Sequence, residues 1–249
     1  MHVHLPKPLH GWRELIGEVG IIVLGVLIAL GFEQVAESVH DRRLADETRA
    51  SIKQELQTGL ASLSFRREAE PCIGRRLGEV RQLIDGWGRT GSFKTPRWIG
   101  AAPRLGVSLP RYEAASAAGR LALLPSDEQF RFGTLVTGLR TFQDTQVEEA
   151  SEWAKLRELS AGPEALSATD RSVIRAALQE ANMLDYNMKT GTGQFLALAA
   201  DYGLHPDFAA FHARAKLTWK TGRFAPTVCS AIDTPPAVAT ANSVVPLPE

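Results

Sequence analysis

Residues 15–32 form the one segment of this chain that is too apolar to lie comfortably in water. Within it, Glu18 is the one charged side chain. At 1.5 Å per residue these 18 residues make a helix of about 27 Å, close to the roughly 30 Å hydrocarbon core of a bilayer. The segment therefore predicts a transmembrane anchor, and it limits compartment and topology before any other feature does.

The flanks of this segment indicate its orientation. Residues 1–14 contain two basic side chains, Lys7 and Arg13, against one acid, whereas residues 33–47 contain five acids against two arginines. Lys and Arg are enriched on the cytoplasmic side of membrane helices. We therefore expect a cytoplasmic N-terminal segment over residues 1–14, with the rest of the chain on the opposite side.

A cleaved signal peptide and a buried core helix are the two alternatives to a retained anchor. Ala29, Leu30 and Gly31 have the small-x-small pattern of a signal-peptide cleavage site. Glu14 and Glu18 are unusual in a signal peptide, however, and the helical pattern continues past the site. These observations favour a retained anchor over residues 15–32.

Three residues of the anchor suggest contacts within the membrane. Gly25 and Ala29 have the small-xxx-small spacing that lets two helices approach closely, so self-association is one hypothesis. Glu18 is unfavourable in hydrocarbon unless its carboxylate reaches the interface, pairs with Arg13, or docks a polar group of another membrane protein. The expected partners are membrane lipid and, through this face, a second membrane protein or a second copy.

The charge of the chain is balanced overall but unevenly distributed. Lys plus Arg and Asp plus Glu number 28 each, which gives no indication of nucleic-acid binding. Residues 66–120 hold eleven bases against five acids, whereas residues 126–210 hold thirteen acids against seven bases. We expect these two halves to pack and neutralise each other; the alternative is a basic face directed at anionic lipid or an anionic envelope polymer.

Cys72 and Cys229 are the only cysteines. In a chain exported to an oxidising compartment, two distant thiols predict one disulfide, which would tie the C-terminal tail to the helix around Cys72. Closing a loop this long would stabilise the fold by roughly 5 kcal/mol in the chain-entropy model. Neither cysteine has a second Cys or a His at ligand spacing, so no metal site is expected.

The apolar pattern after the anchor is helical. Ile52, Leu56, Leu60 and Leu63 recur at helical spacing, and no Gly or Pro interrupts residues 33–57. A juxtamembrane helix over residues 33–70 is therefore predicted, ending at Pro71, with residues 40–51 as a solvated stalk.

Residues 71–222 are predicted to form a helical bundle. Its first helix ends at Gly86 and Gly88. A helix over residues 126–160 is expected to open with a capping box of Ser126 and Gln129, and the next to open with a cap at residues 167–170. The residues expected to face inward are Ile73, Leu77, Val80, Leu83, Ile84, Trp87, Phe130, Leu135, Val136, Leu139, Phe142, Trp153, Leu156, Ile174, Leu178, Ala181, Leu184, Met188, Phe195, Leu196 and Ala199.

The glycines and prolines predict the remaining boundaries. Gly191 and Gly193 are expected to kink or divide the last long helix, and Gly203 to end it. Short helices are expected over residues 111–119 and 206–217. Residues 223–249 are a flexible tail except where Cys229 fixes them. The predicted fold class is therefore all-α: a transmembrane helix that continues into a stalk, then an irregular bundle of about four main helices.

A long loop over residues 88–110 contains the one candidate binding surface outside the membrane. Phe93 and Trp98 lie among Lys94 and Arg97, a mixture suited to an interfacial surface or to polymer binding. The commoner use of such aromatic residues is to fix a loop onto its own domain.

Residues 9–14, residues 17–31 and, more loosely, residues 112–125 resemble a family of uncharacterised bacterial proteins. The anchor motif is Gly-Glu-Val-Gly-Ile-Ile-Val-Leu-Gly-Val-Leu-Ile-Ala-Leu-Gly. Those proteins are small, anchored in the inner membrane and carry helical exported domains. The resemblance implies a bacterial inner-membrane, single-pass location with Glu18 retained and the C-terminal domain periplasmic; it implies no activity.

No local pattern in the sequence indicates catalysis, and no cofactor or metal is expected. Glu148, Glu149 and Glu152 form an acidic ridge that we interpret as a solvated helix face. The leading hypothesis is a non-catalytic binding, scaffold or accessory module. The second is a sensor or ligand-binding domain with a pocket near Tyr112, Arg120 and the long loop, and the third is a hydrolase with a cryptic site.

Overall fold

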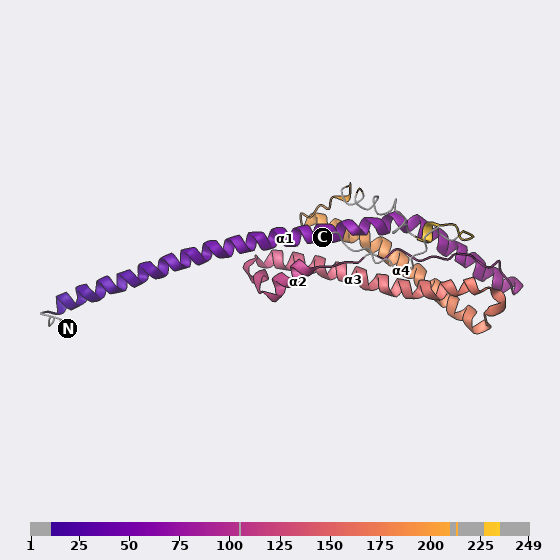
Figure 1. Ribbon diagram of the computed structural model, residues 1–249, viewed down its shortest axis with the longest axis horizontal. Helices are drawn as coiled ribbons and strands as arrows, with labels where there is room; N and C mark the ends of the chain where they lie inside the picture. The colour runs from indigo at the N-terminus through magenta and orange to yellow at the C-terminus, as the bar shows by residue number, and fades with distance from the viewer. Residues whose placement is uncertain (1–10, 105, 210–212, 214–226, 235–249) are drawn as a thin grey trace, which may run out of the picture.

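The chain folds around one very long helix, as Figure 1 shows. The computed structural model describes residues 11–104, 106–209, 213 and 227–234. No strand occurs among these residues. The helices in chain order are α1 Trp12–Thr90, α2 Pro110–Ala117, η1 Arg120–Leu123, α3 Ser126–Arg157, η2 Glu158–Ala161, η3 Pro163–Ala165, α4 Ala168–Asp201 and η4 Thr227–Cys229.

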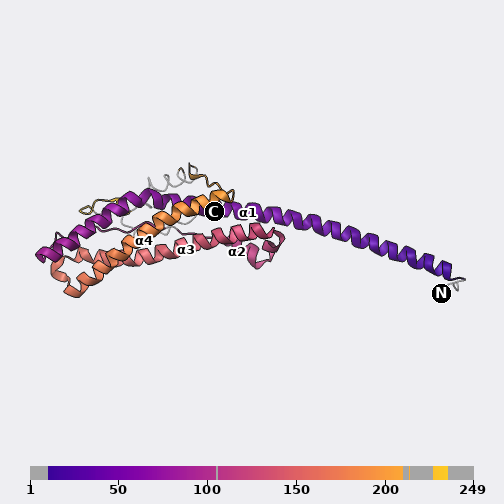
Figure 2. The ribbon, with the colours of Figure 1, turned by 180° about the vertical axis from the view of Figure 1, so that it is seen from behind.

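The N-terminal part of α1 projects from the bundle with no other described element beside it, which Figures 1 and 2 show from opposite sides. Residues 15–39 are exposed there, including all of their large apolar side chains. By length and composition this part of α1 could cross a membrane, and none of its apolar window is buried in the protein. The remainder of α1 packs against α3 and α4.

The prediction that Pro71 ends the first helix is wrong. α1 continues through Pro71 to Thr90, so the predicted juxtamembrane helix and first bundle helix are one element. A proline inside a helix costs about 3 kcal/mol because it removes one hydrogen bond and crowds the preceding turn. The exposed ring of Pro71 is tolerated because Ala69 and Ile73, on either side, are fully buried in the bundle.

The C-terminal end of α1 also lies beyond the predicted one. Gly86 and Gly88 lie inside the helix, which ends at Gly91. Gly91 adopts a left-handed conformation (φ 74°), and its N–H donates to the carbonyl of Trp87. A left-handed residue after the last turn is favourable for glycine, so Gly91 is the position at which the chain can turn away.

Of the two predicted helix caps, one is confirmed. At α4, the Ser167 hydroxyl accepts from the Asp170 N–H, and the Asp170 carboxylate accepts from the Ser167 N–H. At α3, Pro125 occupies the N-cap and no side chain caps the helix; Gln129 instead donates to the Leu124 carbonyl at 2.8 Å. The extended backbone of Pro125 starts the helix one residue early, which places Ser126 inside it.

The glycines of the two later helices behave differently from each other. Gly191 and Gly193 do not divide α4, which is continuous, and a Cβ at either would meet nothing within 4 Å. Gly138 on α3, by contrast, lies close to Phe195 on α4: a Cβ at position 138 would lie 2.2 Å from the Phe195 ring. α3 and α4 therefore approach each other at a point that requires glycine on one of them.

The interior consists of two apolar clusters. The first cluster combines the middle of α1, the start of α3 and the end of α4, and it includes Ile52, Leu56, Leu60, Leu63, Leu135, Leu139 and Met188. The second combines the end of α1, the end of α3 and the start of α4, and it includes Ile73, Leu77, Val80, Ile84, Trp153, Leu156, Ile174 and Leu178. The predicted inward residues are buried or half-buried with one exception, Phe130, which is 68% exposed. Phe132, two positions on, occupies the core instead.

The prediction of a solvated stalk over residues 40–51 is wrong in its second half. Ala45 and Thr48 are buried, because η1 and the start of α3 reach alongside α1 at this level. Of the predicted helix over residues 206–217, only residues 206–209 and 213 are among the described residues. Of the predicted tail, residues 227–234 are.

Replacing Gly138, which is crowded by Phe195, and Gly191, which is not crowded, tests the close approach of α3 and α4. We expect Gly138→Ala to lower the free energy of unfolding by about 1–3 kcal/mol, because the Phe195 ring must leave its position. Gly191→Ala is the matched control and should be neutral or stabilising by up to about 1 kcal/mol, since the site is open and alanine favours helix. Urea unfolding of the full chain in detergent, followed by circular dichroism, measures both. Equal effects would contradict the close contact.

Candidate functional site

A buried layer of charged side chains separates the two apolar clusters. Arg66 of α1 donates through Nη2 to Glu149 of α3 at 2.9 Å and to Asp185 of α4 at 2.6 Å. Each of the three long helices thus contributes one residue. We call Arg66, Glu149 and Asp185 the charged layer.

The burial of this layer is almost complete. Arg66 and Glu149 are 0% and 1% exposed at their side chains, and Asp185 is 18% exposed. Arg66 Nε and Nη1 and the Oε1 of neighbouring Glu70 are buried without a hydrogen-bond partner among the described residues. Buried polar groups are normally paired, so this is an unfavourable arrangement that the packing of three helices maintains.

The acids of the layer bind protons more strongly than exposed carboxylates do. Burial raises the pKa of Glu149 and of Asp185, and Arg66 partly opposes this effect in both. Burial also raises the pKa of Glu70, again against the attraction of Arg66 and Lys189. Three carboxylates therefore share one fully buried guanidinium, which favours a bound proton among them.

The sequence interpretation of Glu149 is wrong. We predicted a solvated acidic ridge, but only Glu148 is exposed; Glu152 pairs with Lys155 at 2.7 Å and Glu149 is buried. A signal was present: Glu149 lies at helical spacing between Phe142 and Trp153 on the buried stripe. Arg66 and Asp185 likewise follow the apolar stripes of α1 and α4. Of the eleven bases in the basic half, Arg66 is the one for which the described residues show an ion pair with acids of the acidic half, so the expected neutralisation is seen at this layer alone.

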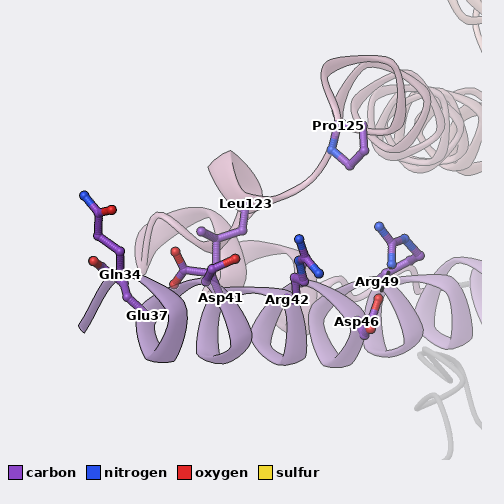
Figure 3. Close-up of a pocket in the computed structure, with 10 residues that line it drawn as sticks. Gln34, Glu37, Asp41, Arg42, Asp46, Arg49, Leu123 and Pro125 are labelled. Atoms are coloured by element: carbon purple, nitrogen blue, oxygen red, sulfur yellow. Dashed lines mark hydrogen bonds and ion pairs between the residues drawn. The ribbon is translucent and has the colours of Figure 1, made fainter. Parts of the chain in front are cut away.

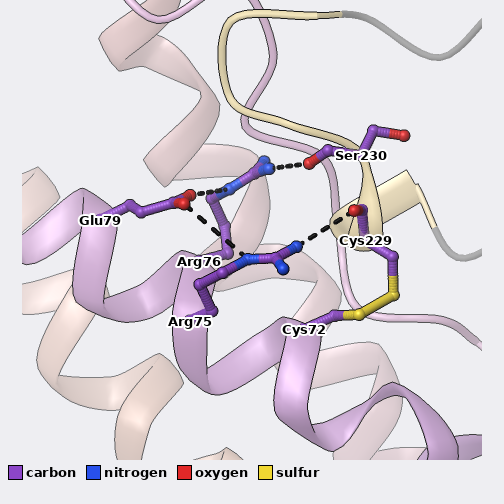
Figure 4. The surroundings of a disulfide bond; sticks show 6 residues. All are labelled: Cys72, Arg75, Arg76, Glu79, Cys229 and Ser230. Atoms are coloured by element: carbon purple, nitrogen blue, oxygen red, sulfur yellow. Dashed lines mark hydrogen bonds and ion pairs between the residues drawn. A yellow bond between two sulfur atoms is a disulfide. The ribbon is translucent and has the colours of Figure 1, made fainter.

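A second constellation fixes the C-terminal segment, as Figure 4 shows. The structure joins Cys72 and Cys229 in the predicted disulfide, with their Cα atoms 4.9 Å apart. Arg76, fully buried, donates to the carbonyls of Trp98, Ile99 and Ser230, and Arg75 donates to the Cys229 carbonyl at 3.1 Å. We call this set of contacts the C-terminal clasp.

Contacts at and beside the C-terminal clasp hold most of the loop that we predicted as a binding surface. Phe93 is half-buried and meets Trp87 edge-on at 5.3 Å; Lys94 is exposed and pairs with Asp233 at 2.9 Å. Trp98 is half-buried, and its backbone N–H donates to the Ile232 carbonyl at 2.8 Å. Arg97 is exposed. The ring of Phe93 and the backbone of Trp98 thus attach the loop to its own domain, which is the alternative use considered above.

An open groove of about 600 Å³ lies where α1 leaves the bundle, and Figure 3 shows its walls. Its lining residues are Gln34, Glu37, Ser38, Asp41, Arg42, Ala45, Asp46, Arg49, Leu123 and Pro125. Arg49 is bound to both carboxylate oxygens of Glu128, at 3.0 and 2.8 Å, and to Asp46 at 2.5 Å. Tyr112 and Arg120, near which we predicted a ligand pocket, do not line this groove, which adjoins Leu123 at the end of η1.

The three residues that we predicted to act in a membrane anchor lie on the projecting part of α1. Glu18, Gly25 and Ala29 are all exposed, and no described residue outside α1 covers them. Among the described residues, no group of three His, Cys, Asp or Glu side chains is arranged to hold a metal ion.

No protein-family model, curated protein or solved structure matches this chain. The likeness of its N-terminal segment to a bacterial membrane-protein family stays a prediction.

Removing the cation of the charged layer should be costly. We expect Arg66→Met to lower the free energy of unfolding by about 3–5 kcal/mol, because it leaves Glu149 and Asp185 buried without their partner. Arg67→Met is the control: its side chain is exposed, and the expected change is within about 0.5 kcal/mol. Urea midpoints of the two variants in detergent give the comparison. Similar losses in both would show that Arg66 contributes no more than a surface arginine.

The raised pKa values predict an unusual pH dependence of stability. The folded protein holds protons at Glu149, Asp185 and Glu70 above the ordinary carboxyl pKa values of 4.5 and 3.8, so it binds more protons than the unfolded chain between those values and the raised ones. The contribution of these three carboxyl groups to stability is therefore complete below their pKa in the unfolded chain, and it is lost as pH rises through their pKa in the folded protein. We expect the Tm to rise as pH is lowered from 7.5 towards 5.

Glu149→Gln should flatten this rise, because the amide cannot take up the proton. Hydrogen bonds from Ser167 lower the pKa of Asp170, so this carboxylate stabilises the fold above pH 3.8 and loses its contribution below it. That loss lies outside the pH range of the test. Thermal melts at three pH values between 5 and 7.5 measure the slope. A Tm that falls steadily on acidification in the wild-type chain would contradict the prediction.

Proposed function

We propose that this chain is a single-pass protein of the bacterial inner membrane whose periplasmic helical bundle serves as a non-catalytic binding, scaffold or accessory module. The observation that carries the proposal is the continuity of α1. One helix of 79 residues, about 118 Å long, includes both the segment that could cross a membrane and the backbone of the bundle. A bundle built on such a helix would be positioned rigidly relative to the membrane.

The height of the bundle above the membrane follows from the same helix. Twelve residues separate Phe32, at the end of the apolar segment, from Ala45, the first buried residue of the core. At 1.5 Å per residue this interval is about 18 Å. The proposed anchor would therefore hold the bundle above the headgroups, where it can meet other proteins of the envelope.

The use of the polar groups supports a structural rather than a catalytic role. Arg66, Glu149 and Asp185 bind one another, Arg76 binds backbone carbonyls, and both cysteines are joined in a disulfide. Each of these constellations fixes one element to another. A scaffold or accessory module requires this kind of rigidity.

A second candidate function is a sensor or ligand-binding domain, and the groove beside α1 favours it. Its volume is within the range of small-molecule sites, and it presents both acidic and basic side chains. A ligand whose binding is lost in Arg42→Gln but kept in Arg43→Gln would favour this function, since Arg42 lines the groove and Arg43 does not.

Topology in intact cells tests the leading proposal. We expect a thiol reagent that cannot cross the inner membrane to label a cysteine placed at exposed Glu180 in spheroplasts, and not one placed at His4. The anchor should also resist alkaline extraction, and the mass of the purified protein should include residues 1–31. Labelling at His4 alone would reverse the topology, and a purified protein whose mass shows that it begins at Phe32 would replace the anchor by a signal peptide.

A further inference from the structure

The stalk of α1 is amphipathic, and its apolar side faces away from the bundle. Between the apolar segment and the bundle, the apolar residues Phe32, Val35, Ala36 and Val39 recur at helical spacing i, i+3, i+4 and i+7. Phe32, Val35 and Val39 are 73%, 62% and 48% exposed. Large apolar side chains on one side of a helix normally face a partner.

The bundle of the same chain does not supply that partner. The side of the stalk that continues the bundle-facing stripe is polar, with Gln34, Ser38 and Asp41 lining the groove. At 3.6 residues per turn, the apolar side lies roughly a third of a turn away from it. The polar side therefore faces the chain's own domain, and the apolar side is left open.

The open side continues into the anchor without a change of register. Gly25, Ala29, Phe32, Ala36 and Val39 follow one another at alternating spacings of four and three, and Ile28 and Val35 complete the heptad pattern. We call Gly25, Ile28, Ala29, Phe32, Val35, Ala36 and Val39 the stalk stripe. Its small residues would let two helix backbones approach closely within the membrane.

We propose that the stalk stripe binds the stalk stripe of a second copy of this chain, forming a parallel two-stranded coiled coil that begins in the membrane and extends into the stalk. This inference is built on the proposed function, since a common membrane orientation is what places two copies parallel. Two copies with one topology present Phe32, Val35 and Val39 at the same height, so the stripe is complementary to itself.

The charges near the stripe agree with a second copy as the occupant. No charged residue lies on the stripe between Gly25 and Val39, and Glu33 and Glu37 lie on other sides of the helix. Two copies can therefore pair without opposing like charges. The stripe ends where Arg42 and Arg43 follow Val39, and the pairing ends with it.

The size of the stripe is sufficient for a specific contact. An aliphatic side chain buries roughly 60–120 Å² when fully covered, and an aromatic one about 150–250 Å². Counted over both copies, the stripe would bury on the order of 1,000 Å², which is near the lower limit for a stable interface. Val35 and Val39 add a hydrophobic driving force in water that the membrane part of the stripe lacks.

Cysteine crosslinking of the full chain in its native membranes tests this pairing. Val35→Cys and Val39→Cys place a thiol on the stripe, whereas Gln34→Cys and Asp41→Cys are matched controls on the groove side at the same heights. The native cysteines stay joined in their own disulfide. We expect a mild oxidant to give a covalent dimer at positions 35 and 39 and none at 34 and 41, because a disulfide needs Cβ atoms about 4 Å apart.

The outcomes separate this proposal from the proposed function. Equal yields at all four positions, or no dimer at any, in chain that resists alkaline extraction would overturn the pairing and leave the anchor in place. Dimer confined to positions 35 and 39 in chain that is extracted would support the pairing and overturn the anchor. As a second variant, Phe32→Glu should abolish the dimer at position 39 while the far-ultraviolet circular dichroism of the bundle is unchanged.

Discussion

The apolar stripe of α1 between Ala45 and Trp87 is the constraint on which the rest of the structure depends. It contributes residues to both apolar clusters, in which α3 and α4 also bury residues of their own apolar faces. The continuity of this stripe also explains why Pro71 does not end the helix. Burying Ala69 and Ile73 on both sides of the proline offsets a cost of about 3 kcal/mol.

The charged layer divides this stripe in two and fixes how the three helices meet. A sliding of α3 or α4 by one turn would keep apolar residues against apolar residues, but it would separate Glu149 or Asp185 from Arg66. Buried ionic groups contribute little net stability and can specify register. We regard the layer as the feature that selects one alignment of three long helices whose apolar stripes would tolerate several.

The C-terminal clasp and the stalk stripe lie on different parts of α1 and differ in what they contact: the clasp joins parts of the same domain, whereas the stripe is exposed. The clasp directs polar groups inward: Arg76 binds the loop and the tail to α1, and the disulfide closes the same junction. The stalk stripe directs apolar groups outward, away from the domain. This division agrees with the proposed accessory or scaffold role, in which the domain is rigid and the stalk and the proposed anchor contact other chains.

The sequence by itself determined the all-α class, the apolar segment, most inward-facing residues and the pairing of Cys72 with Cys229, because each of these follows from local spacing or from having only two cysteines. The helical spacing of Arg66, Glu149 and Asp185 also places them on apolar stripes, but we interpreted Glu149 as solvated and did not single out Arg66 or Asp185. Only the tertiary structure decided that α1 passes Pro71, that Gly138 meets Phe195, and that those three charges meet in one layer. These depend on which faces of distant helices lie opposite each other, and helical periodicity carries no information about that.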